Sequence, residues 1–305
     1  MKKISAILLI LVLLFSSCSN NAKKTETTKI VKKPEITDKA KTPDSTEITE
    51  PEKKETTEEK TAEVEKPAPE PSDNEPVPSV EELDEQEIIA EESSLCGKVI
   101  VIDPGHGINS YSKQEPIAPG SSQLKAAFVS GTRGANQTEE QLNLSVGLKL
   151  KAALEEKGAI VYMTRETHEC DVSNVERAQM ANELNADIAI RIHADGADNS
   201  SAHGVSVLVP GNQYITDSTL ISESRSAGEY VLSAFVEETG AQNRGISVRN
   251  DMTGFNWSTV PVLLVEMGFM TNPEEDRLME TEDYQHKMVS GMVNGLEQYF
   301  GKSAE

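Results

Sequence analysis

Aromatic residues are scarce in this chain of 305 residues, which contains 6 Phe, 6 Tyr and 1 Trp. Residues 19–95 have none of them, yet they hold 8 of the 14 prolines and carry 11 Lys against 22 Asp and Glu. Such a segment cannot bury enough apolar surface to offset the conformational entropy that folding would remove. We therefore predict a disordered linker over residues 19–95, extended by its prolines and by repulsion between its negative charges.

Positive charge is also scarce: 29 Lys and Arg face 51 Asp and Glu, for a net charge of −22. Residues 96–305 hold 16 of the basic and 29 of the acidic residues, a net charge of −13. A domain this acidic is repelled by phosphate backbones and by anionic lipid surfaces. This balance argues against nucleic acid or anionic lipid as a partner of the domain, which we expect to act as a monomer.

The apolar run near the N-terminus is too short to cross a membrane. Two lysines precede Ile4–Phe15, and Ser16–Cys18 follow it. This order is typical of a secretory signal, so we expect a signal peptide over residues 1–18 and export of the mature protein. The small residues before Cys18 resemble a bacterial lipoprotein box, although Phe15 stands where that pattern most often has Leu.

The resemblance to a lipoprotein box implies that Cys18 is lipidated and becomes the mature N-terminus. The protein would then be anchored to the extracytoplasmic face of the cell membrane and would reach the cell wall on its linker. As a flexible coil the linker spans roughly 50 Å, and its stretched limit is about 250 Å. An ordinary signal peptide cut near Cys18 is the alternative.

Residues 96–305 are long enough for one well-buried catalytic domain. Apolar runs without alternation, typical of parallel strands covered on both faces, occur at Val99–Asp103, Ile160–Met163, Ile188–Ile192, Val205–Val209 and Val260–Val265. Helices are expected from the capping boxes Thr138–Gln141 and Ser173–Glu176, over Leu220–Thr239, from Asn272 and over Tyr284–Phe300. Alternating strands and helices predict an α/β fold with a twisted, mostly parallel sheet and helices on both faces.

Cysteine is scarce as well, and Cys96 and Cys170 are the only two in the predicted domain. Cys96 precedes the first predicted strand, whereas Cys170 follows the carboxyl end of Ile160–Met163. In a parallel sheet these positions lie at opposite ends, farther apart than the Cα atoms of a disulfide. We therefore predict two free thiols, even though export would permit a disulfide.

Polar side chains of catalytic type follow three of the predicted strands. His106 lies in the Pro-Gly turn after the first strand, His193 directly follows the third, and Glu266 ends the last. Glu139 lies in the first turn of the helix that comes after the first strand. Because the carboxyl ends of parallel strands meet at one edge of the sheet, we expect these four side chains to converge there.

Two imidazoles and a carboxylate are the ligand set of a catalytic zinc site, which leaves one position open for water. Zinc lowers the pKa of that water toward neutrality, and a second carboxylate can pass the water's proton to a leaving amine. The spacing lacks the compact HExxH pattern of a zinc-binding helix, so the residue types alone leave other roles open. His106 between two glycines also suits a turn, and the helix dipole also favours Glu139 and Glu140 in a first turn.

Other polar and aromatic residues have simpler expected roles. His168 and His203 fall in polar segments and are expected to be solvated. Trp257 could stack on a sugar ring, but packing of its own loop is the preferred interpretation. Residues 108–137 have no clear periodicity, which is typical of a functional loop that either covers a metal site or forms part of a substrate groove.

Four segments in this order resemble the zinc-dependent N-acetylmuramoyl-L-alanine amidases of the type 3 family: Val101–Gly107 (VIDPGHG), Glu139–Leu144 (EEQLNL), Arg191–Gly196 (RIHADG) and Pro261–Asn272 (PVLLVEMGFMTN). The resemblance spans essentially all of residues 97–300. It implies the same sheet and helices, and hydrolysis of the amide between the lactyl group of N-acetylmuramic acid and L-alanine in peptidoglycan. Arg191 departs from the small residue that many members have two positions before the second histidine.

The resemblance also implies roles for individual residues. His106, Glu139 and His193 correspond to the zinc ligands, and Glu266 corresponds to the catalytic glutamate. Glu139 is preferred to Glu140 because the family's ligand lies four residues before the asparagine of its motif. The resemblance leaves the substrate-binding residues unassigned.

Two other functions remain as alternatives. A non-catalytic surface lipoprotein could bind peptidoglycan or peptide while zinc serves the structure, and Glu266→Gln would then leave its function unchanged. A metal-dependent deacetylase of wall sugars would use similar chemistry but would release acetate. No separate wall-binding repeat is apparent in the sequence.

Overall fold

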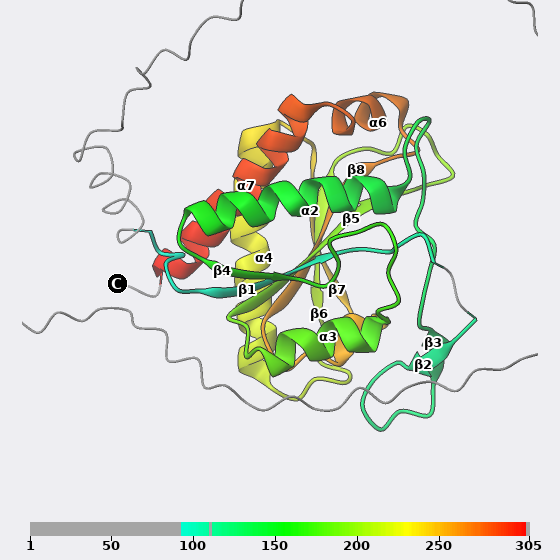
Figure 1. Ribbon diagram of the computed structural model, residues 1–305, viewed down its shortest axis with the longest axis vertical. Helices are drawn as coiled ribbons and strands as arrows, with labels where there is room; N and C mark the ends of the chain where they lie inside the picture. Colours follow the sequence, from blue (N-terminus) through cyan, green and yellow to red (C-terminus); the bar gives the residue numbers. More distant parts are fainter. Residues whose placement is uncertain (1–92, 110–111, 303–305) are drawn as a thin grey trace, which may run out of the picture. The chain divides into compact units, whose positions relative to one another are not determined.

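The computed structural model describes residues 93–109 and 112–302, which form the domain drawn in colour in Figure 1. The predicted signal peptide, with Cys18, and the predicted linker up to residue 92 lie outside the described residues. Within the described ranges, no helix is both long and apolar enough to cross a membrane.

The first described residues belong to the domain, although the sequence places them in the linker. Leu95 is fully buried in the apolar core. The hydroxyl of Ser94 donates to the carbonyl of Glu297 at 2.7 Å. The folded domain therefore includes residues that precede the expected boundary at Cys96.

A sheet of six strands forms the centre of the domain, in the order β4, β1, β5, β8, β6, β7. These strands are β1 (Val99–Pro104), β4 (Ile160–Met163), β5 (Ile188–Asp195), β6 (Val205–Pro210), β7 (Asn243–Arg249) and β8 (Val262–Phe269). β1 is parallel to β4 and β5, and β5 is parallel to β8, whereas β6 is antiparallel to β8 and parallel to β7. The strands therefore confirm the predicted mostly parallel sheet.

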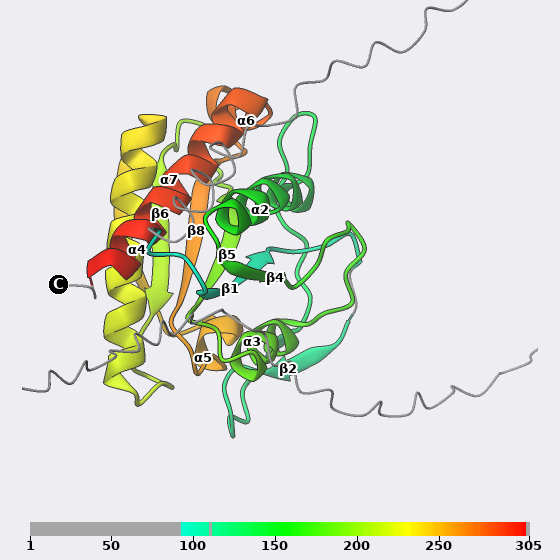
Figure 2. The same cartoon turned by 60° about the vertical axis from the view of Figure 1, so that its left-hand side comes forward.

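Helices cover both faces of this sheet, as predicted (Figure 1, Figure 2). They are α2 (Glu139–Glu156), α3 (Asn174–Glu183), α4 (Ser218–Thr239), α5 (Thr253–Asn256), α6 (Pro273–Met279) and α7 (Glu282–Gly301). Side chains of α2, α4 and α7 share one apolar core with Ile100 and Ile190 of the sheet. Side chains of α3 and α5 share a second core with Val101 and Ala189, which point to the opposite face because strand side chains alternate.

The capping boxes predicted from the sequence start two of these helices. The Glu176 N–H donates to the Ser173 hydroxyl at 3.4 Å, and the Ser173 N–H donates to the Glu176 carboxylate at 2.8 Å. Thr138 and Gln141 form the same reciprocal pair at the start of α2. Because both orphan donors of the first turn are satisfied in this way, the box fixes the position of Glu139, the first residue of α2.

Two strands continue beyond the ends that their apolar runs predict. β5 extends through His193 to Asp195, and β8 starts at Val262 and extends through Glu266 to Phe269. The ladder pairs His193 with Glu266 directly. Hydrophobicity reports burial rather than backbone pairing, so the prediction that both residues stand at or after strand ends is wrong.

Some elements were not predicted from the sequence. β7 is an edge strand of mixed polarity with Gly245 at a φ of 88°, so it lacks the apolar run of a buried strand. Residues 108–137 contain the short hairpin of β2 (Gln114–Pro116) and β3 (Leu124–Ala126), whose strands are too short to show periodicity. α3 ends at Glu183, before the expected end near Ala186.

Both cysteines of the described residues are free thiols, as predicted. Cys96 is exposed next to β1's first residues, and Cys170 is buried against Gly107 after β1's last residues. The length of β1 therefore separates them.

Candidate metal centre and active site

His106 occupies a tight turn directly after β1. Its backbone has a φ of 62°, in the left-handed region that His, Asn and Asp adopt more readily than other side chains. Its Nδ1 lies 2.7 Å from the carbonyl oxygen of Val129. Since a carbonyl can only accept, Nδ1 donates the proton, which leaves Nε2 as the nitrogen that can bind a cation.

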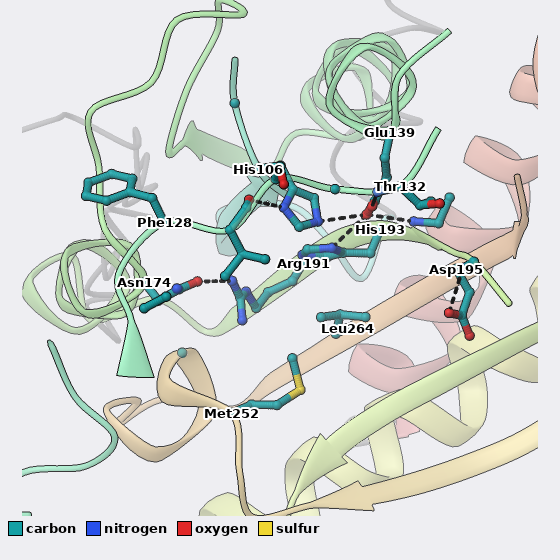
Figure 3. A pocket seen from close by; sticks show the side chains of 18 of the residues that line it. His106, Phe128, Thr132, Glu139, Asn174, Arg191, His193, Asp195, Met252 and Leu264 are labelled. Atoms are coloured by element: carbon teal, nitrogen blue, oxygen red, sulfur yellow. Dashed lines mark hydrogen bonds and ion pairs between the residues drawn. The ribbon is translucent and has the colours of Figure 1, made fainter. Parts of the chain in front are cut away.

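The carboxylate of Glu139 bridges two histidines (Figure 3). Its Oε1 lies 3.0 Å from Nε2 of His106 and 3.0 Å from Nδ1 of His193. The Thr132 N–H donates to Oε2 at 2.8 Å, and the Ala194 N–H donates to Oε1 at 3.2 Å. Burial alone would raise the pKa of Glu139, but its bonds with the two histidines hold that pKa well below its ordinary value. The carboxyl group is therefore ionised.

His193 extends from β5 toward the same point. Its ring centroid lies 4.7 Å from that of His106, and the ring planes are 81° apart. Burial lowers the pKa of His193 to about 4 despite the opposing effect of Glu139, so the ring is neutral at pH 7. Its Nε2 is buried and has no hydrogen-bond partner among the described residues. Gly105 makes room for the ring, because a Cβ there would lie 2.2 Å from Cε1.

These three side chains form a site that suits a cation. One ligand atom from each of His106, Glu139 and His193 lies within 4.8 Å of the others, the one such cluster found in the described residues. Nε2 of His106 and the ionised carboxylate of Glu139 are 3.0 Å apart, a separation that a shared proton or a bound cation can bridge. Tetrahedral zinc ligands at about 2.0–2.1 Å from the metal are about 3.3 Å apart, close to the 3.0 Å separations here. The donor set and its spacing fit zinc.

Glu266 stands on β8 beside this cluster. It is the register partner of His193 on β5, and partners on neighbouring strands point to the same face of a sheet. Its Oε2 is buried without a hydrogen-bond partner among the described residues. Burial, with repulsion from Glu139 and Asp195, raises the pKa of Glu266 to about 8. A dication bound at the cluster would lower that pKa again.

One cavity of about 570 Å³ joins the four side chains that the sequence analysis singled out. Its wall is formed by residues 125–132, which belong to the segment without periodicity, by residues 193–198 at the end of β5 and just beyond it, and by residues 252–254. Glu139 and Glu266 lie in it together with both histidines. A cavity of this size is in the range of ligand sites.

Other residues discussed above lie outside this cavity. Glu140 is turned away from the histidine pair, and its Oε2 lies 2.9 Å from Nδ1 of His168. His168 and His203 are both exposed, as expected, although the ring of His168 also bonds with Glu140. The indole N–H of Trp257 donates to the carbonyl of Pro116 at 2.9 Å, so this ring packs its own loop.

Several groups that hold the site were not assigned from the sequence. The Val129 carbonyl and the Thr132 N–H belong to the segment without periodicity. Nearly every residue type supplies these backbone groups, so the sequence does not reveal them. The side chain of Asn143 donates to Oε1 of Glu139 at 3.3 Å. Its place one helical turn after Glu139 is a signal that could have identified it.

Comparisons with known proteins agree with this geometry. Residues 100–298 match the family described as N-acetylmuramoyl-L-alanine amidase. The chain belongs to this family. An N-acetylmuramoyl-L-alanine amidase of Mycobacterium tuberculosis is 29% identical over 209 residues, which cover 67% of this chain and 87% of that protein. The probable cell wall amidase LytH of Staphylococcus epidermidis is 29% identical over 206 residues, which cover 68% of this chain and 60% of that protein.

Solved structures of amidases share the fold. The crystal structure of an N-acetylmuramyl-L-alanine amidase, Ami1, from Mycobacterium smegmatis superposes with a TM-score of 0.63 at 27% identity, covering 68% of this chain and 99% of that chain. An N-acetylmuramoyl-L-alanine amidase from Clostridium difficile superposes with a TM-score of 0.55 at 28% identity, covering 67% of this chain and 97% of that chain. The aligned part is the catalytic domain of this amidase.

A buried ion network lies beneath the site of this amidase. Asp103, at the end of β1, accepts hydrogen bonds from Arg177 at 2.5 Å, Arg191 at 2.7 Å and the hydroxyl of Thr164 at 2.6 Å. Burial alone would raise the pKa of Asp103, but the two guanidinium groups and the hydroxyl hold it far below its ordinary value. The network ties the end of β1, and hence the turn of His106, to α3 and β5.

Asp103→Asn is expected to lower the free energy of unfolding by about 3–5 kcal/mol at pH 7, because buried guanidinium groups lose their carboxylate. The pKa of Asp103 is lower in the folded state than in the unfolded state, where it is about 4. The contribution of its carboxylate to the free energy of unfolding is therefore fully present above about pH 4 and is lost as the pH falls below that. Urea unfolding of both proteins should give a difference that shrinks below about pH 4.

The matched control is Asp251→Asn, which removes an exposed carboxylate 2.8 Å from Nε of Arg249. An exposed pair contributes about 0–1 kcal/mol, so this change should be small at every pH. Equal losses in the two variants, or a loss at Asp103 that does not depend on pH, would contradict the role given to the network.

Proposed function

We propose that this amidase cleaves the bond between the lactyl group of N-acetylmuramic acid and L-alanine in peptidoglycan, with zinc as its metal. His106, Glu139 and His193 hold the zinc, and Glu266 is the general base and acid. The observation that supports these roles most strongly is the Glu139 carboxylate between two imidazoles, with an unpaired Glu266 oxygen in the same cavity. The family match and the amidase names of the relatives support the bond and the substrate.

Zinc supplies Lewis acidity when bound, since it polarises a carbonyl and lowers the pKa of a water molecule toward about 7. The protein's own groups hold and move the protons. Glu266 accepts a proton from the attacking water and delivers it to the amide nitrogen, which leaves as the α-amine of alanine. The oxygen of the water stays in the lactyl carboxylate, so atoms and charge balance.

The roles of the neighbouring groups follow from their contacts. The Val129 carbonyl keeps the proton of His106 on Nδ1 and turns Nε2 toward the site. The Thr132 and Ala194 N–H groups orient the carboxylate of Glu139. The Oε2 of Glu266 has no hydrogen-bond partner among the described residues and lies in the same cavity, so it is free to exchange a proton with water or a leaving amine.

Residues 112–127 are proposed to support the substrate groove and not to cover the metal. Three contacts fasten this segment to α3 and α5: Glu115 accepts from the Val175 N–H at 3.2 Å, and the carbonyls of Pro116 and Ile117 accept from Trp257 at 2.9 Å and from Asn256 at 3.1 Å. The segment leads directly into residues 128–132, which line the cavity and contact two of the proposed ligands.

Replacing residues 114–126 by two glycines is expected to lower kcat/KM by about 10–100-fold, the usual effect of losing groups that orient metal ligands. The ends of the hairpin are neighbours in the ladder, so a short connection closes the gap. Zinc content and thermal unfolding, measured alongside the rate, separate a loosened site from an unfolded protein. Higher activity with normal zinc content would show instead that the segment is a cover.

We propose that the protein acts outside the cytoplasm, tethered to the membrane through a lipidated Cys18. The order of charge, apolar run and small residues before Cys18 supports this, as does the cell-wall name of one relative. Cys18→Ser should move the protein from the membrane fraction to the soluble fraction. Membrane association that survives the substitution would exclude the lipid tether.

The proposed reaction is tested by counting new amino groups during digestion of purified peptidoglycan. Each cleaved bond creates one N-terminal alanine, whereas deacetylation would create amino sugars and acetate, and a binding protein would create neither. We expect alanine amines to appear with added zinc and to stop forming with a chelator. Acetate release or an unchanged amine count with zinc bound would overturn the proposal.

A further inference from the structure

Three arginines are buried in the network beneath the site. Arg165, Arg177 and Arg191 are all buried, and their carboxylate partners are Asp103, which serves two of them, and Glu140. Direct ion pairs join these three guanidinium groups to two carboxylates, and Glu115 and Glu266 lie close enough to interact with Arg177 and Arg191. A buried guanidinium group needs acceptors for its N–H donors, so a donor without one is open to a ligand.

Arg191 has the free hydrogen-bonding capacity in this network. Arg165 donates to the carbonyls of Pro104, Thr167, Gly105 and Glu140, and Arg177 donates to those of Val172, Pro104 and His106 and to Asp103. Arg191 donates through Nε to Asp103 and through Nη2 to Asn174. No described residue accepts a hydrogen bond from its Nη1, so this end of the guanidinium group is available to a ligand.

The free end of Arg191 lies in the wall of the catalytic cavity. Arg191, Asn174 and Gly254 all line that cavity, and Figure 3 shows the guanidinium group beside Asn174. A Cβ at Gly254 would lie 2.5 Å from Nη1. Glycine at this position therefore leaves the space around Nη1 open.

Side chains of opposite charge flank His193 on β5. Arg191, His193 and Asp195 are alternate residues of one strand, so their side chains leave the same face. The proposed metal ligand stands between a cation and an anion. Arg191 thus attracts an anionic group of the substrate, and Asp195 repels it. This difference orients the bound substrate along β5, with its anionic group toward Arg191.

We propose that Arg191 binds a carboxylate of the substrate, carried by the stem-peptide residue that follows the alanine. Two residues of a strand rise about 6.6 Å, and one extended peptide residue spans about 3.3–3.6 Å. The positions of Arg191 and His193 are therefore separated by about the length of two extended peptide residues. This inference rests on the proposed function and adds its substrate class: stem peptides with a free carboxylate at the second position are preferred over those with a carboxamide there.

The simplest competing role for Arg191 is electrostatic support of the reacting groups, because its charge acts on Glu266 and His193. That role would change the turnover of every substrate by the same factor. A direct contact changes the ratio between a carboxylate substrate and its carboxamide, because a charged hydrogen bond is stronger than a neutral one. The ratio separates the two roles.

The test compares N-acetylmuramoyl-L-alanyl-D-glutamate with the same compound carrying a carboxamide in place of the α-carboxylate. The zinc-loaded full chain is assayed as wild type, Arg191→Gln and Gly254→Ala, and kcat/KM is measured for both compounds. Gly254→Ala keeps every charge and only crowds Nη1. It therefore tests the same contact if the Arg191→Gln variant fails to fold. Arg249→Gln is the control, since it removes a cation that also acts on Glu266 but does not line the cavity.

Wild type and Arg249→Gln are expected to prefer the carboxylate compound by at least about tenfold, and both other variants should lose most of that preference. Equal kcat/KM for the two compounds in wild type, or a preference that survives both variants, would overturn the inference. Binding of both compounds to zinc-loaded Glu266→Gln provides a measurement that does not need turnover. A preference in binding with no cleavage by wild type would refute the proposed function but support the carboxylate contact of Arg191. Cleavage without a preference would support the proposed function and refute that contact.

Discussion

Glu266→Gln is expected to lower kcat by about 10²–10⁴-fold, the usual contribution of a positioned general acid and base. Glutamine has nearly the same shape but cannot accept the proton of water at neutral pH. The proposed ligands are unchanged, so the variant should bind zinc in the same ratio as wild type. The rate of alanine amine release and the zinc content of the purified protein measure the two effects.

Glu140→Gln is the matched control for this change. Glu140 is also a buried glutamate, but it faces Arg165 and His168 and not the histidine pair. Its substitution should reduce activity by less than about tenfold, since it touches no reacting group. Near wild-type turnover by Glu266→Gln would show that Glu266 is not the general base and acid. Loss of no function in this variant would favour a binding protein in which the metal serves the structure.

His193→Ala is expected to abolish stabilisation of the folded protein by zinc. When free zinc is 100-fold above its dissociation constant, binding raises the free energy of unfolding by about 2.7 kcal/mol. Loss of one of three protein ligands leaves too few donors for a zinc site of this type. Thermal unfolding with and without zinc measures the effect, and each variant is compared with its own metal-free form, so the cost of the substitution itself cancels.

His203→Ala is the control for the metal experiment. His203 is exposed, and its Nδ1 lies 2.9 Å from the carbonyl oxygen of Ser201. Its variant should keep the full zinc-dependent shift. A zinc-dependent shift that persists in His193→Ala, or that disappears in His203→Ala as well, would show that the metal binds elsewhere.

The sequence predicts the parts of the site that depend on side-chain pattern. The apolar runs locate the strands that bear His193 and Glu266, and the capping box at Thr138 locates the first turn of α2 with Glu139. These signals work because strand burial and helix capping are local properties of the chain. The rule that parallel strands end at a common edge then brings residues far apart in sequence into one cavity.

The features that the sequence did not predict are those that depend on tertiary contact. β7 is held by pairing at the sheet edge, although its residues are of mixed polarity and none of them is fully buried. The carbonyl of Val129 orients His106 through a backbone group that any residue could supply. Arg191 stands out in the sequence only as a departure from the family, and its free Nη1 becomes apparent only once Asp103 and Asn174 are seen to occupy its other donors.

The most direct test of the central claim is mass spectrometry of peptidoglycan digested in water enriched in ¹⁸O. Hydrolysis at the proposed bond places one ¹⁸O in the lactyl carboxylate of the glycan and releases unlabelled stem peptides that begin with a free alanine amine. We expect these products from the zinc-loaded wild type and not from Glu266→Gln. Intact lactyl–alanine bonds with zinc bound, or label found in released acetate, would contradict the claim that this chain is a zinc-dependent amidase of the cell wall.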